Sequence, residues 1–214
     1  MRRRLSLFVN GFIAVFALLA WIWMTFTIDR HGDLSAQDFE SLRYFTVWSN
    51  LLQAAVSALW AIQLIGLCRG KHGPSRWLIR FKFVANASVA LTFFTALCFL
   101  GPVFGFGNLY VGSNFWFHLV LPLLAMLDYW LLDREGDHGF VDTLWAVLPM
   151  LAYAALYIGN LAVNGLGHGA ETNDWYSFAI YGPRPLFAVF AGLLVANWMI
   201  ALLMLLRRRR GDKR

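Results

Sequence analysis

Six long apolar segments limit what this chain can fold into more than any other feature of its sequence. Each has about the 20 residues that a helix needs to cross a hydrocarbon core of ~30 Å. The gaps between them are short, so no separate soluble domain fits in the 214 residues. The sequence therefore predicts an all-α integral membrane protein, a single six-helix bundle over residues 1–214. The expected spans are 5–28, 44–68, 83–104, 115–132, 141–163 and 186–206.

Basic residues are distributed unevenly between the two sides of this predicted bundle. Of the 18 Lys and Arg residues, 15 flank the two ends of the chain or lie in the second-to-third and fourth-to-fifth connections. Arg30, Arg43 and Arg184 lie on the other side. Since cytoplasmic loops carry the excess of Lys and Arg, we expect both termini in the cytoplasm. The expected location is the plasma membrane, which is the inner membrane of a bacterium.

The net charge of +6 is therefore first a signal of topology. A short basic tail beside a membrane span attracts anionic lipid headgroups more readily than it forms a nucleic-acid surface. We expect membrane lipids as partners and no nucleic acid, and the sequence leaves the oligomeric state open.

Polar side chains follow one face of the second span. Thr46, Asn50, Gln53 and Ser57 are spaced at i, i+4, i+7 and i+11, which places them on the same side of a helix. The fourth span contains His118, the one histidine within any of the six spans. Polar groups are costly in hydrocarbon, so they usually face the protein interior and mark a site.

Thr46 and His118 are expected at the same depth, because both spans enter from the outer side and each residue lies ~3–5 Å below it. A neutral imidazole can take the proton of a hydroxyl and make it a nucleophile. Asn50 then either holds the developing oxyanion or orients the pair. The alternative is helix packing, in which the threonine bonds its own preceding turn and the polar face joins helices.

Other polar residues are expected near the same outer cavity. Asn114 lies one turn before His118, and Tyr157 and Asn160 share a face of the fifth span that ends on the outer side. These side chains either line the cavity or form bonds between helices. The expected supporting residues are Ser49, Asn50, Gln53, Asn114, Tyr157 and Asn160.

Asp128 is the one acidic residue well inside a span. It follows His118 by ten residues, which places it ~15 Å deeper and excludes a direct contact with that imidazole. We expect a structural role near the cytoplasmic end, in an ion pair with Lys82 or Arg80. A proton or ion pathway is the alternative.

Metal and haem binding have weak support in the sequence. A membrane haem usually needs two axial ligands, and the spans hold a single histidine. His168, Glu171 and Asp174 share an outer loop, but their spacing is too loose to indicate a metal site. The sequence therefore predicts no metal and no cofactor.

Two motifs carry a resemblance to a known family. Residues 43–52 read RYFTVWSNLL and residues 117–128 read FHLVLPLLAMLD. They resemble the bacterial branch of the androgen-induced-protein family of six-span membrane proteins, and the layout of spans is similar over nearly the whole chain. Animal members hydrolyse fatty-acid esters of hydroxy fatty acids with a membrane threonine and histidine. The resemblance implies that Thr46 is the nucleophile and His118 the base.

The expected function is thus hydrolysis of an amphiphilic acyl ester near the outer leaflet, without a cofactor. The alternative is a non-enzymatic membrane protein that uses the same cavity: a small transporter, or a lipid-binding or assembly protein. An apolar tunnel ending at Thr46 would favour the hydrolase, whereas a polar path from His118 to Asp128 would favour transport.

Overall fold

The computed structural model, which describes residues 1–26, 38–70, 72–133, 135–168 and 171–211, is built of helices. Within these residues, six helices are long and apolar enough to cross a membrane, as the sequence predicts. Residues 27–28, the expected end of the first span, lie outside the described residues. The six spans are Arg2–Phe26, Phe45–Cys68, Arg76–Phe104, Gly112–Leu132, Phe140–Asn164 and Pro183–Arg207.

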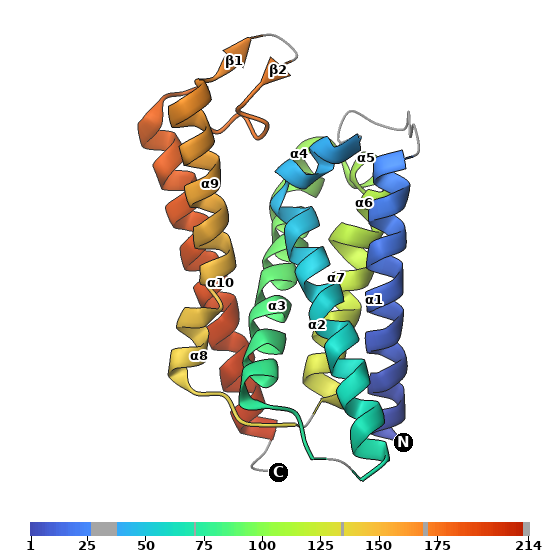
Figure 1. Ribbon diagram of the computed structural model, residues 1–214. Helices are drawn as coiled ribbons and strands as arrows, with labels where there is room; N and C mark the ends of the chain where they lie inside the picture. Colours follow the sequence, from blue (N-terminus) through green and yellow to red (C-terminus); the bar gives the residue numbers. More distant parts are fainter. Residues whose placement is uncertain (27–37, 71, 134, 169–170, 212–214) are drawn as a thin grey trace.

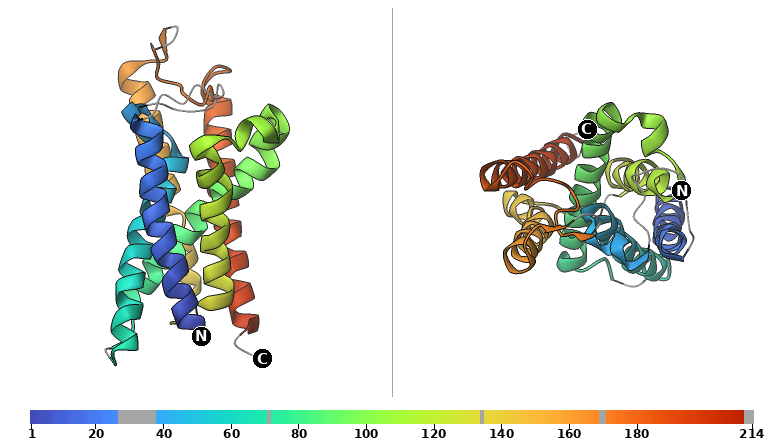
Figure 2. Two further views of the ribbon diagram at one scale, coloured as in Figure 1. Left: turned by 90° about the vertical axis from the view of Figure 1, so that its right-hand side faces the viewer. Right: turned by 90° about the horizontal axis from the view of Figure 1, so that it is seen from above.

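The helices form two groups that share α3 (Arg76–Thr95) as the central element (Figures 1 and 2). One group packs α1, α2 and the fourth span around one side of α3, and the other packs α8, α9 and α10 against its opposite side. Both termini lie at one end of the bundle, called the inner end below (Figure 1). The bounds are α1 Arg2–Phe26, α2 Phe45–Cys68, α8 Phe140–Trp145, α9 Leu148–Asn164 and α10 Pro183–Gly211.

The helix of the third span begins at Arg76, seven residues before the predicted position 83. The side chain of Ser75 accepts a hydrogen bond of 3.3 Å from the backbone N–H of Leu78, which caps the start of the helix. Arg80 and Lys82 therefore lie within the helix and not in the preceding loop. The fourth, fifth and sixth spans also begin one to three residues earlier than predicted.

Irregular turns interrupt several spans. α3 continues as a π-helical turn, Ala96–Leu100, and then as α4 (Gly101–Phe104). The fourth span alternates α6 (Gly112–Phe115), a π-helical turn Trp116–Val120, α7 (Leu121–Leu127) and a second π-helical turn Asp128–Leu132. The fifth span breaks between α8 and α9, where Asn197 of α10 donates to the carbonyl of Ala146 at 3.0 Å.

The outer end is covered by the connections between spans. A 3₁₀ turn (Asp38–Arg43) precedes α2, and α5 (Phe106–Leu109) lies between α4 and α6. The connection from α9 to α10 includes a small hairpin, β1 (Gly167–His168) and β2 (Glu171–Thr172), which pair in antiparallel register. The last of these connections reaches the start of α2, where the Tyr176 hydroxyl accepts a hydrogen bond from the backbone N–H of Phe45.

Candidate functional site at the outer end

Thr46 and His118 meet at the outer end of the first helix group. Thr46 is the second residue of α2, and His118 lies in the π-helical turn Trp116–Val120. Their Oγ1 and Nε2 atoms are 3.2 Å apart, within hydrogen-bonding distance. His118 is buried at 7% exposure, whereas Thr46 keeps partial access to the surface. Thr46 and His118, which were expected at the same depth, are thus in contact although they are 72 positions apart in the chain.

The widened turn around His118 follows from the sequence. Pro122 has no N–H, and its ring collides with the carbonyl four residues back in a regular helix, which is the carbonyl of His118. The chain instead forms a π-helical turn in which the N–H of Leu121 reaches the carbonyl of Trp116. Such turns often occur at functional sites.

Asn50 joins the two helices beside the pair. Its Nδ2 donates to the carbonyl of Phe117 at 3.1 Å and to the carbonyl of Thr46 at 2.8 Å. The Phe117 carbonyl is the one that residue 122 would bind in a π-helical pattern if it were not proline. Asn50 therefore supplies the missing donor, and both of its N–H groups are used. This geometry makes Asn50 a residue that positions the pair and leaves it no N–H for an oxyanion.

The other predicted supporting residues of α2 form bonds away from the imidazole. Ser49 Oγ lies 3.0 Å from the carbonyl of Thr46 and 3.0 Å from Thr92 Oγ1 on α3. Gln53 Nε2 donates to Ser57 Oγ at 3.0 Å. Both side chains are buried, so they join helices deeper in the interior and do not touch the pair.

Asn114 lies in α6, one turn before His118, and is 8% exposed. Its backbone interacts with the imidazole of His118. Asn114 and His118 both belong to the fourth span, so this interaction is made within one helix.

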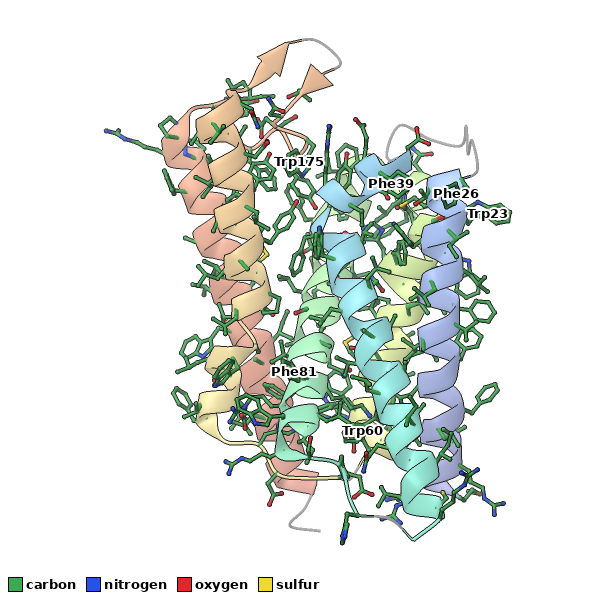
Figure 3. The ribbon with its side chains drawn as sticks, viewed as in Figure 1. Trp23, Phe26, Phe39, Trp60, Phe81 and Trp175 are labelled. Carbon is green, nitrogen blue, oxygen red and sulfur yellow. The ribbon has the colours of Figure 1, made fainter. Side chains whose placement is uncertain are left out.

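The start of α2 is held by an outer clamp, which consists of Tyr153, Trp175 and Tyr176. The backbone N–H of Phe45 donates to the Tyr176 hydroxyl at 3.1 Å, and the Tyr153 hydroxyl donates to the carbonyl of Arg43 at 2.5 Å. Trp175 Nε1 donates to the Tyr153 hydroxyl at 3.0 Å, and Figure 3 shows Trp175 between α9 and the start of α2. Burial raises the pKa of the Tyr176 hydroxyl to about 12, so it stays protonated at neutral pH.

Tyr157 and Asn160 bind the outer loop, and within the described residues neither forms a hydrogen bond with Thr46 or His118. The Tyr157 hydroxyl donates to the carboxylate of Asp174, and Asn160 Nδ2 donates to the carbonyl of Asn173 at 3.4 Å. Asp174 also accepts hydrogen bonds from the backbone of the loop that follows it. The structure thus assigns these two residues to bonds between α9 and its connection, one of the two interpretations that the sequence left open.

Asp128 lies at the inner end, far from the pair. Its Oδ2 is 2.7 Å from Lys82 Nζ and 2.8 Å from Asn10 Nδ2, and both charged side chains are 1% exposed. Lys82 also lies 3.3 Å from Asp133 and 4.0 Å from the centre of the Trp60 ring. Of the two partners expected for Asp128, Lys82 is present, whereas Arg80 binds Asp142 at 2.7 Å.

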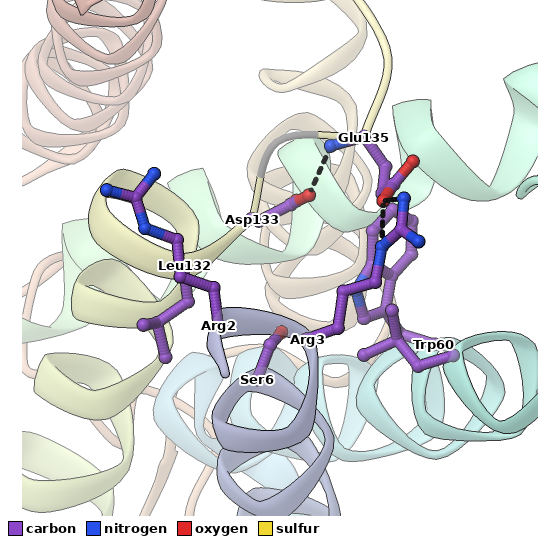
Figure 4. Close-up of a pocket in the computed structure, with 8 residues that line it drawn as sticks. Arg2, Arg3, Ser6, Trp60, Leu132, Asp133 and Glu135 are labelled. Carbon is purple, nitrogen blue, oxygen red and sulfur yellow. Dashed lines mark hydrogen bonds and ion pairs between the residues drawn. The ribbon is translucent and has the colours of Figure 1, made fainter. Parts of the chain in front are cut away.

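Two cavities lie at opposite ends of the first helix group. The inner cavity, of about 200 Å³, is lined by Trp60 and Asp133 among others (Figure 4). The outer cavity, of about 240 Å³, lies between α1 and the start of the fourth span, against Trp23 and Trp116. Neither of these two cavities is lined by Thr46 or His118. No tunnel to Thr46 is therefore seen among them.

Among the described residues, no three His, Cys, Asp or Glu side chains come together as a metal site. The side chains of His168 and Glu171, which share an outer loop with Asp174, lie outside the described part of the chain.

Comparison with protein-family models, curated proteins and solved structures finds no match to this chain. The resemblance carried by residues 43–52 and 117–128 stays a prediction.

Proposed function

We propose that this membrane protein hydrolyses amphiphilic acyl esters, with Thr46 as nucleophile and His118 as general base. The observation that carries the proposal is the 3.2 Å contact between Thr46 Oγ1 and His118 Nε2. The family resemblance of the two motifs supports the same roles. The site lies at the outer end of the bundle, where the ester group of a lipid-like substrate meets water.

The chemistry proceeds in two displacements. His118 Nε2 takes the proton of Thr46 as Oγ1 attacks the ester carbonyl carbon, and the alcohol leaves with that proton. A water molecule then attacks the acyl-threonine, again giving a proton to His118, and the acid leaves as Thr46 is restored. The cycle requires the His118 tautomer that carries its proton on Nδ1, which leaves Nε2 free to accept the proton of Thr46.

The start of α2 offers a donor for the developing oxyanion. A helix leaves its first N–H groups without helical partners, and its dipole favours negative charge there. The N–H of Phe45 binds Tyr176, and the N–H of Val47 binds the carbonyl of Tyr44 at 3.1 Å. Among the described residues, no acceptor binds the N–H of Thr46 itself. We propose that this N–H donates a hydrogen bond to the developing oxyanion.

Covalent labelling tests the proposal directly. A fluorophosphonate probe is expected to label the purified, folded protein, and peptide mass mapping is expected to place the phosphonyl group on Thr46. Heat-denatured protein serves as the control and should not react, because the imidazole no longer lies beside the hydroxyl. A folded protein that stays unlabelled, or carries the label on Ser49, would contradict the assignment.

The proposed orientation places the inner end of the bundle in the cytoplasm, on the basis of the 15 basic residues that the sequence assigns to that side. Reporter fusions after Arg214 and at Lys71 are expected to report the cytoplasm, and a fusion near His168 the opposite side. A C-terminal fusion that reports the outer side would reverse the orientation and with it the leaflet in which Thr46 and His118 meet a substrate.

A further inference from the structure

The interior of the first helix group holds ionisable side chains at both ends. His118 lies at the outer end, and Lys82 and Asp128 lie at the inner end, each 1% exposed. The proposed ester hydrolysis uses His118, but Lys82 and Asp128 have no role in it. Ionisable groups within membrane spans are costly, and they often mark ion or proton pathways.

Polar side chains continue between these two ends. The contact of Ser49 with Thr92 and the contact of Trp60 with Lys82 fix how the antiparallel helices α2 and α3 lie beside one another. Residues 53–57 of α2 consequently lie level with residues 85–88 of α3. On these stretches Gln53, Ser57, Asn86 and Ser88 are all buried, at 0–1% exposure.

Several buried polar atoms of this interior have no hydrogen-bond partner within the protein. Asn10 uses its nitrogen on the carbonyl of Ser6 and on Asp128, as Asn50 uses its own on two carbonyls. Buried polar atoms are nearly always hydrogen-bonded, and ordered water commonly supplies the partner. Within the described residues of α1, α2, α3 and the fourth span, Trp60 Nε1 has no acceptor, and five buried amide or carboxylate oxygens have no donor: Asn10 Oδ1, Asn50 Oδ1, Gln53 Oε1, Asn86 Oδ1 and Asp128 Oδ1.

We infer that these side chains, with water bound between them, form a proton path through the membrane. Lys82 and Asp128 exchange protons across their 2.7 Å contact at the inner end, and His118 with Thr46 exchanges them at the outer end. The groups that face Asp128 are Lys82 on α3 and Asn10 on α1, with Asp133 on the far side of Lys82.

Both ends of the path have access to the surface. At the inner end, the cavity of about 200 Å³ is walled by Trp60 and Asp133 (Figure 4). Both residues contact the ammonium group of Lys82. At the outer end, Thr46 is only partly buried. The Lys82 ammonium group already neutralises the carboxylate of Asp128, so this carboxylate is not free to bind a metal cation. The species that this interior fits is therefore a proton.

Proton flux into liposomes tests the path. The purified full-length protein is reconstituted with the pH-sensitive dye pyranine inside, and a potassium gradient with valinomycin drives proton entry. Wild type is expected to acidify the interior faster than protein-free liposomes do. Asp128→Asn and, separately, Gln53→Leu are expected to lose that excess rate completely. Gln53→Leu removes the polar group in the middle of the path and leaves the ion pair intact.

Two matched controls lie in the second helix group. Asp142→Asn removes a buried carboxylate bound by Arg80, and Asn197→Leu removes a buried amide bound to a backbone carbonyl. Both are expected to keep the wild-type flux. Wild-type liposomes that leak no faster than empty ones would overturn the path, as would Gln53→Leu protein that conducts like wild type. If Asp128→Asn fails to fold, the Gln53→Leu result decides.

Separate measurements distinguish a failure of the proton-path proposal from a failure of the proposed hydrolysis. Ester hydrolysis is measured in detergent on the same preparations, where no gradient exists. Gln53→Leu is expected to keep hydrolysis while losing flux, because Gln53 binds Ser57 and makes no hydrogen bond to Thr46 or His118 in the described structure.

Discussion

Thr46→Ala protein is expected to lose ester hydrolysis and covalent labelling altogether, because the methyl group that remains cannot attack a carbonyl carbon. His118→Ala is expected to hydrolyse the ester about 10²–10⁴-fold more slowly, which is the usual value of general-base help. The double variant should be little worse than either single variant, since the two residues act as a unit. The measurement is the hydrolysis rate of a long-chain acyl ester by each purified protein beside wild type.

Ser49→Ala is the matched control for Thr46→Ala. Ser49 also carries a hydroxyl in the first turns of α2, but it bonds the Thr46 carbonyl and Thr92. We expect this variant to keep most of the activity. Equal rates for well-folded wild-type and Thr46→Ala proteins would remove threonine catalysis and leave the transporter or lipid-binding alternative.

Lys82→Met is expected to lower the free energy of unfolding by about 3–5 kcal/mol, the usual cost of breaking one side of a buried ion pair. The change leaves the carboxylates of Asp128 and Asp133 without the cation that contacts both. For a chain of this size each kcal/mol lowers the melting temperature by about 2–4 °C. Thermal unfolding in detergent, followed by circular dichroism, measures the shift. Asp128→Asn should cost less, because Lys82 keeps its contact with Asp133.

Glu135→Gln provides the comparison. It removes the partner of Arg3 in a 3.0 Å ion pair whose side chains are 59% and 23% exposed, and such exposed pairs are worth about 0–1 kcal/mol. A Lys82→Met shift no larger than the Glu135→Gln shift would show that the buried pair does not stabilise the fold. Folded Asp128→Asn protein should also keep most ester hydrolysis. If folded Asp128→Asn protein loses that activity, the proposed location of the hydrolytic site at the outer end is incorrect.

The helical spans follow from the sequence because a bilayer leaves an apolar segment few choices. Every backbone polar group must be bonded within the chain, so a segment of this length crosses as a helix. The helix of the third span extends beyond its apolar segment for a tertiary reason. Arg80 and Lys82 ended the apolar segment in the sequence, but Asp142, Asp128 and Asp133 bind them within the bundle. These aspartates lie far from α3 in the sequence, so the residues of α3 alone do not predict the ion pairs.

The depth of the candidate site was also available from the sequence, because helix rise converts residue number into distance along the membrane normal. Counting placed Thr46 and His118 at one level, and Pro122 in the sequence explains the widened turn that carries His118. The counting did not give the role of Asn50. Its two donors are used on Thr46 and Phe117, a contact that exists because α2 and the fourth span lie side by side.

Rotation about each helix axis, and the choice of neighbouring helix, were decided by the tertiary structure alone. Tyr157 and Asn160 share the predicted face, yet packing turns that face toward the outer loop. Tyr176 reaches the backbone of Phe45 across 131 positions of the chain, a contact that helical periodicity does not encode. Apolar length and charge fix how deep a residue lies, whereas the fit of side chains between helices fixes which residues it touches.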